Sequence, residues 1–453
     1  MDQSQPRSNT TLAAIAVGVV LGIAYTASPL TIWFIPLAAA LTWWAGRGAS
    51  PREQRWIVGL ILATIAFRLA LLAGLFLFGE PDIQHVPFTV LFGDEQYLIV
   101  RTLRQRALWL GSTMDAEAFQ GVFELYGRTS YVQVLALVQL LVGPSPYGVR
   151  LLSILLYIMG GIVLHRIVRR AYGPVAALGS LAFLLFFPSL VVWSSAAMKE
   201  SLNFLLVVSS IGATILTGRA PWRWRPVAAL GVVASLVWLA TLRDGAIAIA
   251  LAGLAAGIAL AVVTKSPWRL GFAALVVALV AGPVSRSSRV QAAAMDMVRG
   301  AAVKHAGHVY TRGHSYELLD NVFYGHGPRS IQTMTGSDAV RFIERSVASV
   351  ILFPGPWQMR SRAELSYLPE QMVWYVVVLL APIGFLAGLR RDRLATCLFG
   401  AYAAVALLAV AVNSGNLGTL VRHRALALPY LGVLAVVGAA FLLTHLAGRE
   451  TRQ

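Results

Sequence analysis

Long apolar runs dominate this sequence and leave it few ways to fold. Crossing the hydrocarbon core of a bilayer takes about 20 consecutive apolar residues in a helix. Runs of this kind occur at about twelve places: 12–27, 30–45, 56–78, 147–167, 174–193, 200–217, 227–242, 245–264, 268–284, 371–389, 395–412 and 424–446. Apolar residues make up 57% of the chain and charged residues only 13%, far from a soluble composition. The sequence therefore predicts an all-α integral membrane protein with about twelve transmembrane helices.

The basic residues lie in clusters between these runs. The net charge is +17, and Lys and Arg gather at every second connection, as they do in cytoplasmic loops. We therefore interpret the charge as a topology signal and expect no nucleic-acid partner. The clusters assigned to the cytoplasmic side are Arg47/Arg52/Arg55, Arg166/Arg169/Arg170, Arg219/Arg223/Arg225, Lys265/Arg269, Arg390/Arg391/Arg393 and Arg449/Arg452. The alternation requires that 131–142 does not cross, so we expect a re-entrant or interfacial helix there.

Two long polar segments then fall on the extracytoplasmic side, at 79–146 and 285–370. The first mixes apolar and charged residues at helical spacing, which predicts amphipathic helices on the membrane surface. The second is too long for a simple connection and predicts a functional cover or small subdomain. The expected organisation is an N-terminal hairpin with a cytoplasmic loop, a transmembrane core, an extracytoplasmic loop or subdomain, and C-terminal transmembrane helices. These parts cover 1–55, 56–284, 285–370 and 371–453.

Asp94 and Glu95 form a carboxylate pair directly after Gly93 in the first polar segment. Only 20 residues of the chain are acidic, so an adjacent pair in this loop is a candidate for function. Such carboxylates can activate an acceptor hydroxyl as a general base, or do so through a bound metal. They can also cap the start of a helix, where the macrodipole favours negative charge. Both interpretations stay open, and both can hold together.

Some basic residues lie on the predicted extracytoplasmic side, where the positive-inside bias does not favour them. Outer cations oppose the positive-inside bias, which makes them informative about function. With their acidic neighbours they come from three outer turns: Lys199-Glu200, Arg243-Asp244 and Arg422-His423-Arg424. Alternatives are an ion pair or a snorkelling Lys at the first turn, a hairpin cap at the second, and an anionic lipid anchor at the third. We expect these groups and the carboxylate pair to meet in one interfacial cavity, since they share one face of the membrane.

Four histidines in the second polar segment suggest a metal site: His305, His308, His314 and His326. His305 and His308 are three residues apart, which suits one helix face, but no HExxH pattern is present. We therefore favour structural or substrate-contact roles for them. A single cysteine, Cys397, excludes an intrachain disulfide.

An outer carboxylate pair with several cations suits transfer from a lipid phosphate. A base activates the acceptor hydroxyl, and preorganised positive charge stabilises the departing phosphate. An activated lipid donor also fits the extracytoplasmic side, where nucleotides are absent. The sequence thus indicates group transfer from a lipid phosphate on the extracytoplasmic side of the membrane.

The chain resembles the polytopic C-type glycosyltransferase superfamily. The resemblance rests on Gly93-Asp94-Glu95-x-Tyr97 in an early outer loop and on Phe187-Pro188-Ser189 through Trp193-Ser194-Ser195 to Lys199-Glu200. It implies inverting transfer of a sugar from a polyprenyl-phosphate donor to an extracytoplasmic glycan, glycolipid or cell-wall acceptor. It also implies a multi-pass protein of the bacterial inner membrane, with membrane lipids around it and its active site outside the cytoplasm.

The resemblance further implies roles for the candidate residues. Asp94 would be the general base, and Glu95 would orient it. A divalent cation such as Mg²⁺ or Mn²⁺, if one is used, would lie on Asp94 or Glu95. The substrate-binding set would be Tyr97, Lys199, Glu200, Arg243, Asp244, Arg422, His423 and Arg424. Two alternatives remain: a glycan polymerase or ligase acting on undecaprenyl-linked oligosaccharide, and a lipid or polysaccharide transporter, for which Arg68 in mid-span is the main support.

Overall fold

The computed structural model is mainly helical over the residues that it describes. These are 6–78, 93–114, 119–120, 122, 130–146, 148–311, 314–325, 327–359 and 362–450. Within these ranges the extended pairing is limited to one isolated bridge, between Ser315 and Asn416, and no strand forms. The predicted all-α class is confirmed. His326 and most of 79–129 lie outside the described residues.

Ten helices of the described part are long and apolar enough to cross a membrane. They are α2 (Pro29–Gly46), α3 (Pro51–Phe78), α7 (Val149–Tyr172), α10 (Glu200–Arg219), α11 (Arg225–Leu242), α12 (Ala246–Val263), α13 (Pro267–Arg286), α17 (Leu368–Arg391), α18 (Arg393–Asn413) and α20 (Leu428–Glu450). A polytopic membrane protein is therefore confirmed, whereas twelve spans are not. The predicted run 12–27 lies in α1 (Pro6–Ala27), which is not among these ten.

The predicted run 174–193 forms two helices instead of one. α8 (Pro174–Phe186) and α9 (Pro188–Ser195) are bent by 60° against each other. Pro188 explains the break, because proline lacks an N–H to donate and its ring opposes a continuing helix, whereas it is well tolerated at a helix start. The pair raises the number of candidate spans to eleven if it is one crossing.

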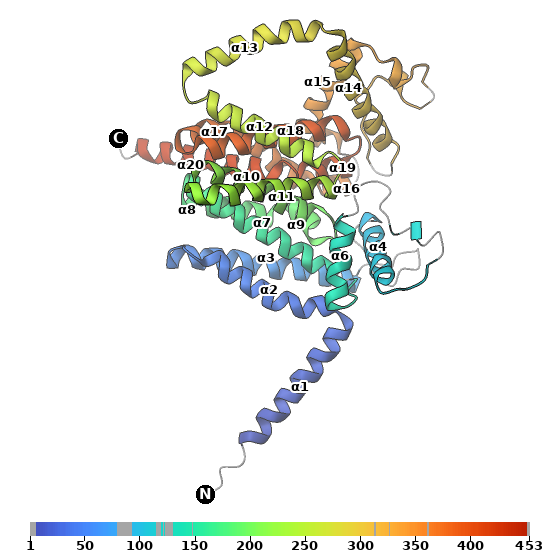
Figure 1. The fold of residues 1–453 in the computed structure, drawn as a ribbon, viewed down its shortest axis with the longest axis vertical. Coiled ribbons are helices and arrows are strands. Elements are labelled where there is room, and N and C mark those ends of the chain that lie inside the picture. Colours follow the sequence, from blue (N-terminus) through green and yellow to red (C-terminus); the bar gives the residue numbers. More distant parts are fainter. Residues whose placement is uncertain are drawn as a thin grey trace. The chain divides into compact units, whose positions relative to one another are not determined.

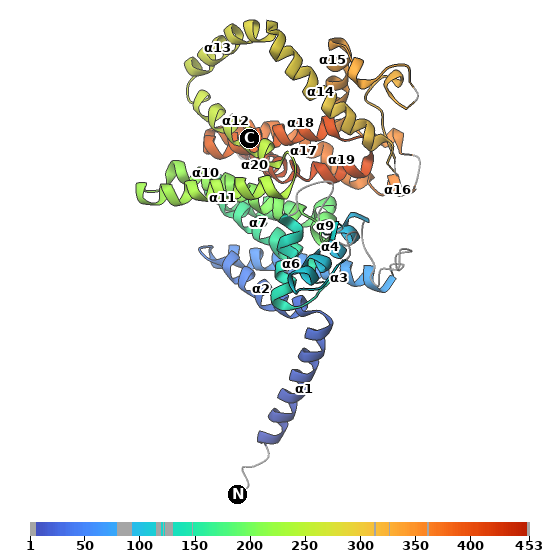
Figure 2. The same ribbon diagram turned by 45° about the vertical axis from the view of Figure 1, so that its right-hand side comes forward.

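The chain divides into two compact units. The first comprises Met1–Leu164, Leu190–Ser210 and Val233–Ala246, and the second comprises His165–Ser189, Ile211–Val232 and Ile247–Gln453. Figure 1 and Figure 2 show their elements in the colours of the sequence. The boundaries fall within transmembrane helices, so each unit takes part of α7, α10 and α11.

In the first unit, α4 (Gly93–Trp109) and α6 (Ser130–Val142) pack on each other beside the ends of α2 and α3 (Figure 1). α6 has 13 residues and is about 20 Å long, less than the roughly 30 Å of a bilayer core. Ser130 Oγ at its start donates to the Thr241 carbonyl near the end of α11 (2.7 Å). Beyond its other end, Ser145 Oγ accepts from the Leu30 amide at the start of α2 (3.3 Å). α6 therefore links the ends of two spans, in line with the interfacial helix expected at 131–142.

In the second unit, α17 and α20 are packed backbone to backbone. A Cβ built on Gly384 would lie 1.7 Å from the Leu434 carbonyl oxygen, and one on Gly438 would lie 2.4 Å from the Leu380 carbonyl oxygen. Two facing glycines thus let the helices approach closely, which is a common way of packing helices where no hydrophobic effect drives them together. α8 and α18 also pack on α20 in this unit.

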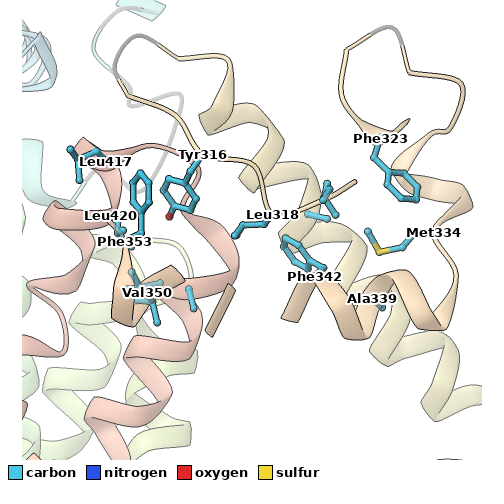
Figure 3. Close-up of a cluster of buried hydrophobic side chains, with 14 of the residues drawn as sticks. Tyr316, Leu318, Phe323, Met334, Ala339, Phe342, Val350, Phe353, Leu417 and Leu420 are labelled. Carbon is cyan, nitrogen blue, oxygen red and sulfur yellow. The ribbon is translucent and has the colours of Figure 1, made fainter. Parts of the chain in front are cut away.

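The second polar segment is folded around a hydrophobic core that it shares with α18 and α19 (Leu417–Arg424). It contains α14 (Ser288–Val309), α15 (Gly336–Leu352) and the short α16 (Arg362–Leu365), and α14 and α15 pack on α18. α15 begins with a capping box between Thr335 and Asp338. Figure 3 shows side chains of α15, α19 and the 316–334 stretch in this core, together with Phe353, which directly follows α15.

Candidate functional site

Glu95 is completely buried in the first turn of α4, and both of its carboxylate oxygens are bound. Arg150, the second residue of α7, donates from Nε to Oε1 at 2.7 Å and from Nη2 to Oε2 at 3.0 Å. The Ala197 backbone amide donates to Oε1 at 2.7 Å. A bidentate guanidinium fork combined with an amide is among the strongest arrangements available to a carboxylate. Glu95 thereby fixes α4 to the start of α7 and to the turn before α10.

Asp94 is exposed to solvent and immediately precedes this anchor. Since Glu95 is held at three points, the backbone that carries Asp94 has a defined position. An accessible carboxylate on a positioned backbone is what general-base catalysis requires. Asp94 also lies in the first turn of α4, where the helix macrodipole favours a negative charge. The two interpretations from the sequence therefore both fit Asp94, while the carboxylate of Glu95 serves as an anchor.

The same anchor brings the turn of Lys199 to the helix of Asp94. Ala197, whose amide binds Glu95, precedes Lys199 by two residues in the connection between α9 and α10. Lys199 is half-buried, and Glu200, the first residue of α10, is buried. Lys199 and Asp94 thus belong to segments that one buried carboxylate holds together.

The turn that contains Arg243 is tied to the same part of the first unit. Arg243 is half-buried and Asp244 is exposed, directly after α11. The bond from Ser130 to Thr241 joins the end of α11 to α6, and α6 packs on α4. The first unit therefore collects Asp94, Lys199 and Arg243 on connections that are bonded or packed together.

Tyr97 lies in α4, one turn beyond Asp94, and is half-buried. The Arg101 guanidinium lies over its ring, 3.9 Å from the centroid, which is a cation–π contact. The ring of Tyr97 is therefore held by its own helix.

Arg422, His423 and Arg424 lie in the last turn of α19, in the second unit. Arg424 is buried, and its guanidinium donates to the carbonyl oxygens of Val350 (3.1 and 2.8 Å) and Phe353 (2.5 Å) and to Gln371 Oε1 (2.9 Å). Burial lowers its pKa to about 10, so it stays charged at neutral pH. These contacts join α19 to the end of α15 and to α17, which makes Arg424 a support for α19. The substrate-binding role predicted for Arg424 stays a prediction.

Arg422 and His423 are half-buried and remain the candidates for phosphate binding on α19. The ring of His423 lies 6.4 Å, centroid to centroid, from that of His308 in α14. Nδ1 of His308 donates to the Asn413 carbonyl at 2.6 Å, so it fixes the loop that leads into α19. Asn416, the N-cap of α19, accepts from the Thr419 amide at 2.7 Å and gives the helix a defined start.

The candidate residues lie in different units. Asp94, Glu95, Tyr97, Lys199, Glu200, Arg243 and Asp244 belong to the first unit, and Arg422, His423 and Arg424 belong to the second. The expected meeting of Asp94 with Lys199 and Arg243 is compatible with the contacts inside the first unit. Its extension to Arg422 and His423 stays a prediction.

The residues present do not favour a metal at Glu95. A cation there would face the Arg150 guanidinium and would have to displace three hydrogen bonds. Among the residues that the structure describes, no group of three His, Cys, Asp or Glu side chains is arranged to hold a metal. His314 pairs with Glu364 at 2.8 Å, apart from the contacts of His305 and His308. Of the predicted pair, Asp94 therefore suits a divalent cation better than Glu95 does.

Sequence reasoning missed Arg150. It is a cation at the start of α7, on the side predicted to be extracytoplasmic, and there it opposes the positive-inside bias as Arg243 does, so the same criterion could have found it. Its partner could not be found this way, since Glu95 lies 55 positions away.

No family model, no curated protein and no solved structure matches the chain. Function is therefore inferred from the residues and contacts of the protein itself.

His305 locks the loop before α19 in a way that depends on its protonation. Its Nδ1 donates to the Ser414 carbonyl (2.7 Å), and its Nε2 accepts from the Tyr324 hydroxyl (2.7 Å). The Tyr324 oxygen itself accepts from the Leu318 and Leu319 amides (2.9 and 3.0 Å). This network requires a neutral imidazole, because a proton on Nε2 would oppose the hydroxyl proton. Burial accordingly lowers the pKa of His305.

We expect the thermal stability of the purified protein to fall as the pH is lowered through 6.5, the ordinary pKa of histidine. Below this pH the unfolded chain takes up a proton that the folded His305 refuses, so protonation favours unfolding. The measurement is Tm in detergent between pH 7.5 and 5. A His305→Gln variant should show a lower Tm at pH 7.5 but a smaller pH slope, while His445→Gln, at an exposed position, should keep the full slope. An unchanged slope in His305→Gln would contradict this role.

Proposed function

We propose that the protein is a membrane glycosyltransferase that moves a sugar from a polyprenyl-phosphate donor to an extracytoplasmic glycan, glycolipid or cell-wall acceptor. One observation supports this most strongly. Asp94 is an exposed carboxylate next to the fully buried Glu95, which Arg150 and the Ala197 amide fix in place. The segments so joined carry one outer cation, Lys199, and the end of α11, which Ser130 of α6 binds, carries another, Arg243. An accessible base beside positive charge is the minimum that transfer from a lipid phosphate needs.

The proposed reaction is a single displacement. Asp94 accepts the proton of the acceptor hydroxyl while the hydroxyl oxygen forms a bond to the anomeric carbon of the sugar. The bond between that carbon and the phosphate oxygen breaks, and its electron pair leaves with the polyprenyl phosphate. Lys199 and Arg243 would stabilise the charge gained by the phosphate, the first as a point charge and the second as a fork. One displacement inverts the configuration at the anomeric carbon.

The order of the helices supports an outer location for this site. With α8 and α9 counted as one crossing, eleven spans run from α2 to α20. Their alternation keeps the predicted cytoplasmic clusters on one side and puts the turns of Lys199, Arg243 and Arg422 on the other. The contacts agree, since the outer connections of the first unit bond to one another through Glu95 and Ala197, Ser130 and Thr241, and Leu30 and Ser145.

Cysteine labelling at the two ends of α11 tests this orientation. We expect a membrane-impermeant maleimide to label Asp244→Cys on intact cells, and to label Trp224→Cys only after the membrane is permeabilised. Both positions are exposed, and the single native cysteine, Cys397, is buried. Labelling in the reverse order would place the Asp94 side in the cytoplasm and remove the proposed reaction.

The function itself is tested by transfer of a labelled sugar. Purified protein in proteoliposomes would receive polyprenyl-phosphate-linked sugars and membrane glycolipid or glycan acceptors from the host cell. We expect labelled acceptor together with free polyprenyl phosphate. Chain growth from an undecaprenyl-linked oligosaccharide would indicate the polymerase or ligase alternative.

The transporter alternative gains little from Arg68. This mid-span residue is buried, and its guanidinium donates to Thr64 and to Ser194 Oγ (3.2 and 3.0 Å) and lies 5.4 Å from the Tyr157 ring centroid. These contacts join α3, α7 and α9 inside the first unit, which is a structural role. Flux across proteoliposomes without a glycosylated product would favour transport instead.

A further inference from the structure

A cavity of about 450 Å³ lies in the second unit where four helix termini approach. Arg219 ends α10, Lys265 follows α12, Arg391 ends α17 and Arg393 begins α18. These are termini that carry the basic clusters assigned above to the cytoplasmic side. The cavity is lined by Arg219, Ile258, Ala261, Val262, Lys265, Arg391, Asp392, Arg393 and Leu394. The charged residues therefore form a pocket and are more than scattered topology signals.

The described lining holds four cations and a single carboxylate, an excess of three positive charges. The carboxylate, Asp392, is committed to Arg219, whose Nη1 and Nη2 donate to its two oxygens at 2.8 and 2.5 Å, and to the Ala395 amide at 3.1 Å. Burial opposes ionisation of Asp392, but these hydrogen bonds outweigh burial and hold its pKa below the usual range. Asp392 thus stays ionised, and its negative charge is paired with Arg219.

The other cations are less neutralised. Arg391 donates from Nη1 to the Tyr172 carbonyl at 2.9 Å, a neutral acceptor. Nε of Arg393 is buried and has no hydrogen-bond partner among the described residues. Lys265 is exposed at the rim. Three positive side chains therefore surround a space that offers them little negative charge, which suits an anionic ligand.

Part of the cavity lining is apolar. Ile258, Ala261 and Val262 come from the last turns of α12, and Leu394 comes from the first turn of α18. A pocket with an apolar wall and a cationic rim, at the ends of membrane spans, matches a headgroup attached to hydrocarbon.

We propose that this cavity is a phosphate-binding site that selects the phosphate of an anionic lipid, because the cations of its lining outnumber the carboxylate and the apolar part suits a lipid chain. Arg391, Arg393 and Lys265 contact the phosphate, and the first carbons of the lipid chain lie along α12. The Arg219–Asp392 pair shapes the floor and keeps Asp392 from repelling the ligand. The inference does not depend on glycosyl transfer, because it concerns other residues at the other ends of the helices.

The test compares ligands and variants by titration of the full chain in detergent, with Tm shift and native mass spectrometry as readouts. The ligands are phosphatidylglycerol, phosphatidylcholine and glycerol phosphate. We expect phosphatidylglycerol to bind at least tenfold more tightly than either of the others. The double variant Lys265→Gln/Arg393→Gln should lose about tenfold or more of this affinity. Arg223→Gln/Arg225→Gln removes two exposed cations that do not line the cavity and should bind as wild type does.

A second variant distinguishes lipid binding in the cavity from lipid binding to diffuse surface charge. Val262→Phe enlarges the apolar part of the lining at an exposed position without changing any charge, and it should weaken phosphatidylglycerol binding while Tm without lipid stays near that of the wild type. Equal losses in the Lys265/Arg393 and Arg223/Arg225 variants, or normal binding by Val262→Phe, would overturn the site. Glycerol phosphate binding as tight as the lipid would retain the phosphate site and overturn the selection of a lipid.

Discussion

Replacing Asp94 with Asn is expected to lower sugar transfer by a hundredfold or more while the protein stays folded in the membrane. The substitution keeps the shape of the side chain and removes its capacity to accept a proton, and general-base catalysis typically contributes about 10²- to 10⁴-fold. Asp94 is exposed, and the bonds of Glu95 to Arg150 and Ala197 do not involve its carboxylate. The transfer rate in proteoliposomes and Tm are the two readouts.

Asp296→Asn is the matched control for this prediction. It makes the same chemical change at another exposed aspartate, in α14, and should leave the transfer rate within about twofold of wild type. Near-normal transfer by Asp94→Asn would remove Asp94 as the base, and would leave the polymerase or ligase alternative, which does not require it.

The second large effect is expected at Glu95, where Glu95→Gln should destabilise the first unit by about 3–5 kcal/mol. The glutamine is nearly isosteric, but it leaves the buried guanidinium of Arg150 without its counter-charge. The measurement is the free energy of unfolding in mild detergent with increasing denaturant. Transfer should fall as well, because Asp94 loses its positioned backbone.

A double variant shows whether the buried charge is the cause. Glu95→Gln/Arg150→Met removes both charges and should recover most of the lost stability, since buried ion pairs can often be replaced by apolar groups at little cost. If the double variant were as unstable as the sum of the two single variants, the two residues would not act as a pair, and Glu95 would not be an anchor.

The spans could be predicted from the sequence because hydropathy over a long window reports directly on the helix environment. The bend in 174–193 could also be read, since Pro188 lies inside the run. The predicted number of twelve crossings is not confirmed, since ten helices of the described part qualify, or eleven if α8 and α9 form one crossing.

The roles within the candidate site were harder to predict, because they depend on which way neighbouring side chains point. Asp94 and Glu95 are adjacent in α4 and point about 100° apart, so one is exposed and the other is buried. Arg422 and Arg424 are two residues apart in α19 and therefore face opposite ways. The guanidinium of Arg424 binds backbone carbonyl groups. The identity of a residue indicates its chemistry, while its partner, here Arg150 or Val350, comes from a distant segment.

A density map of the protein in nanodiscs with a polyprenyl-phosphate sugar bound tests the central claim most directly. The account predicts donor density at the Asp94 end of the first unit, with the phosphate within hydrogen-bonding distance of Lys199 or Arg243 and the sugar next to the Asp94 carboxylate. Donor density at the Trp224 end of α11, with none beside Asp94, would contradict it.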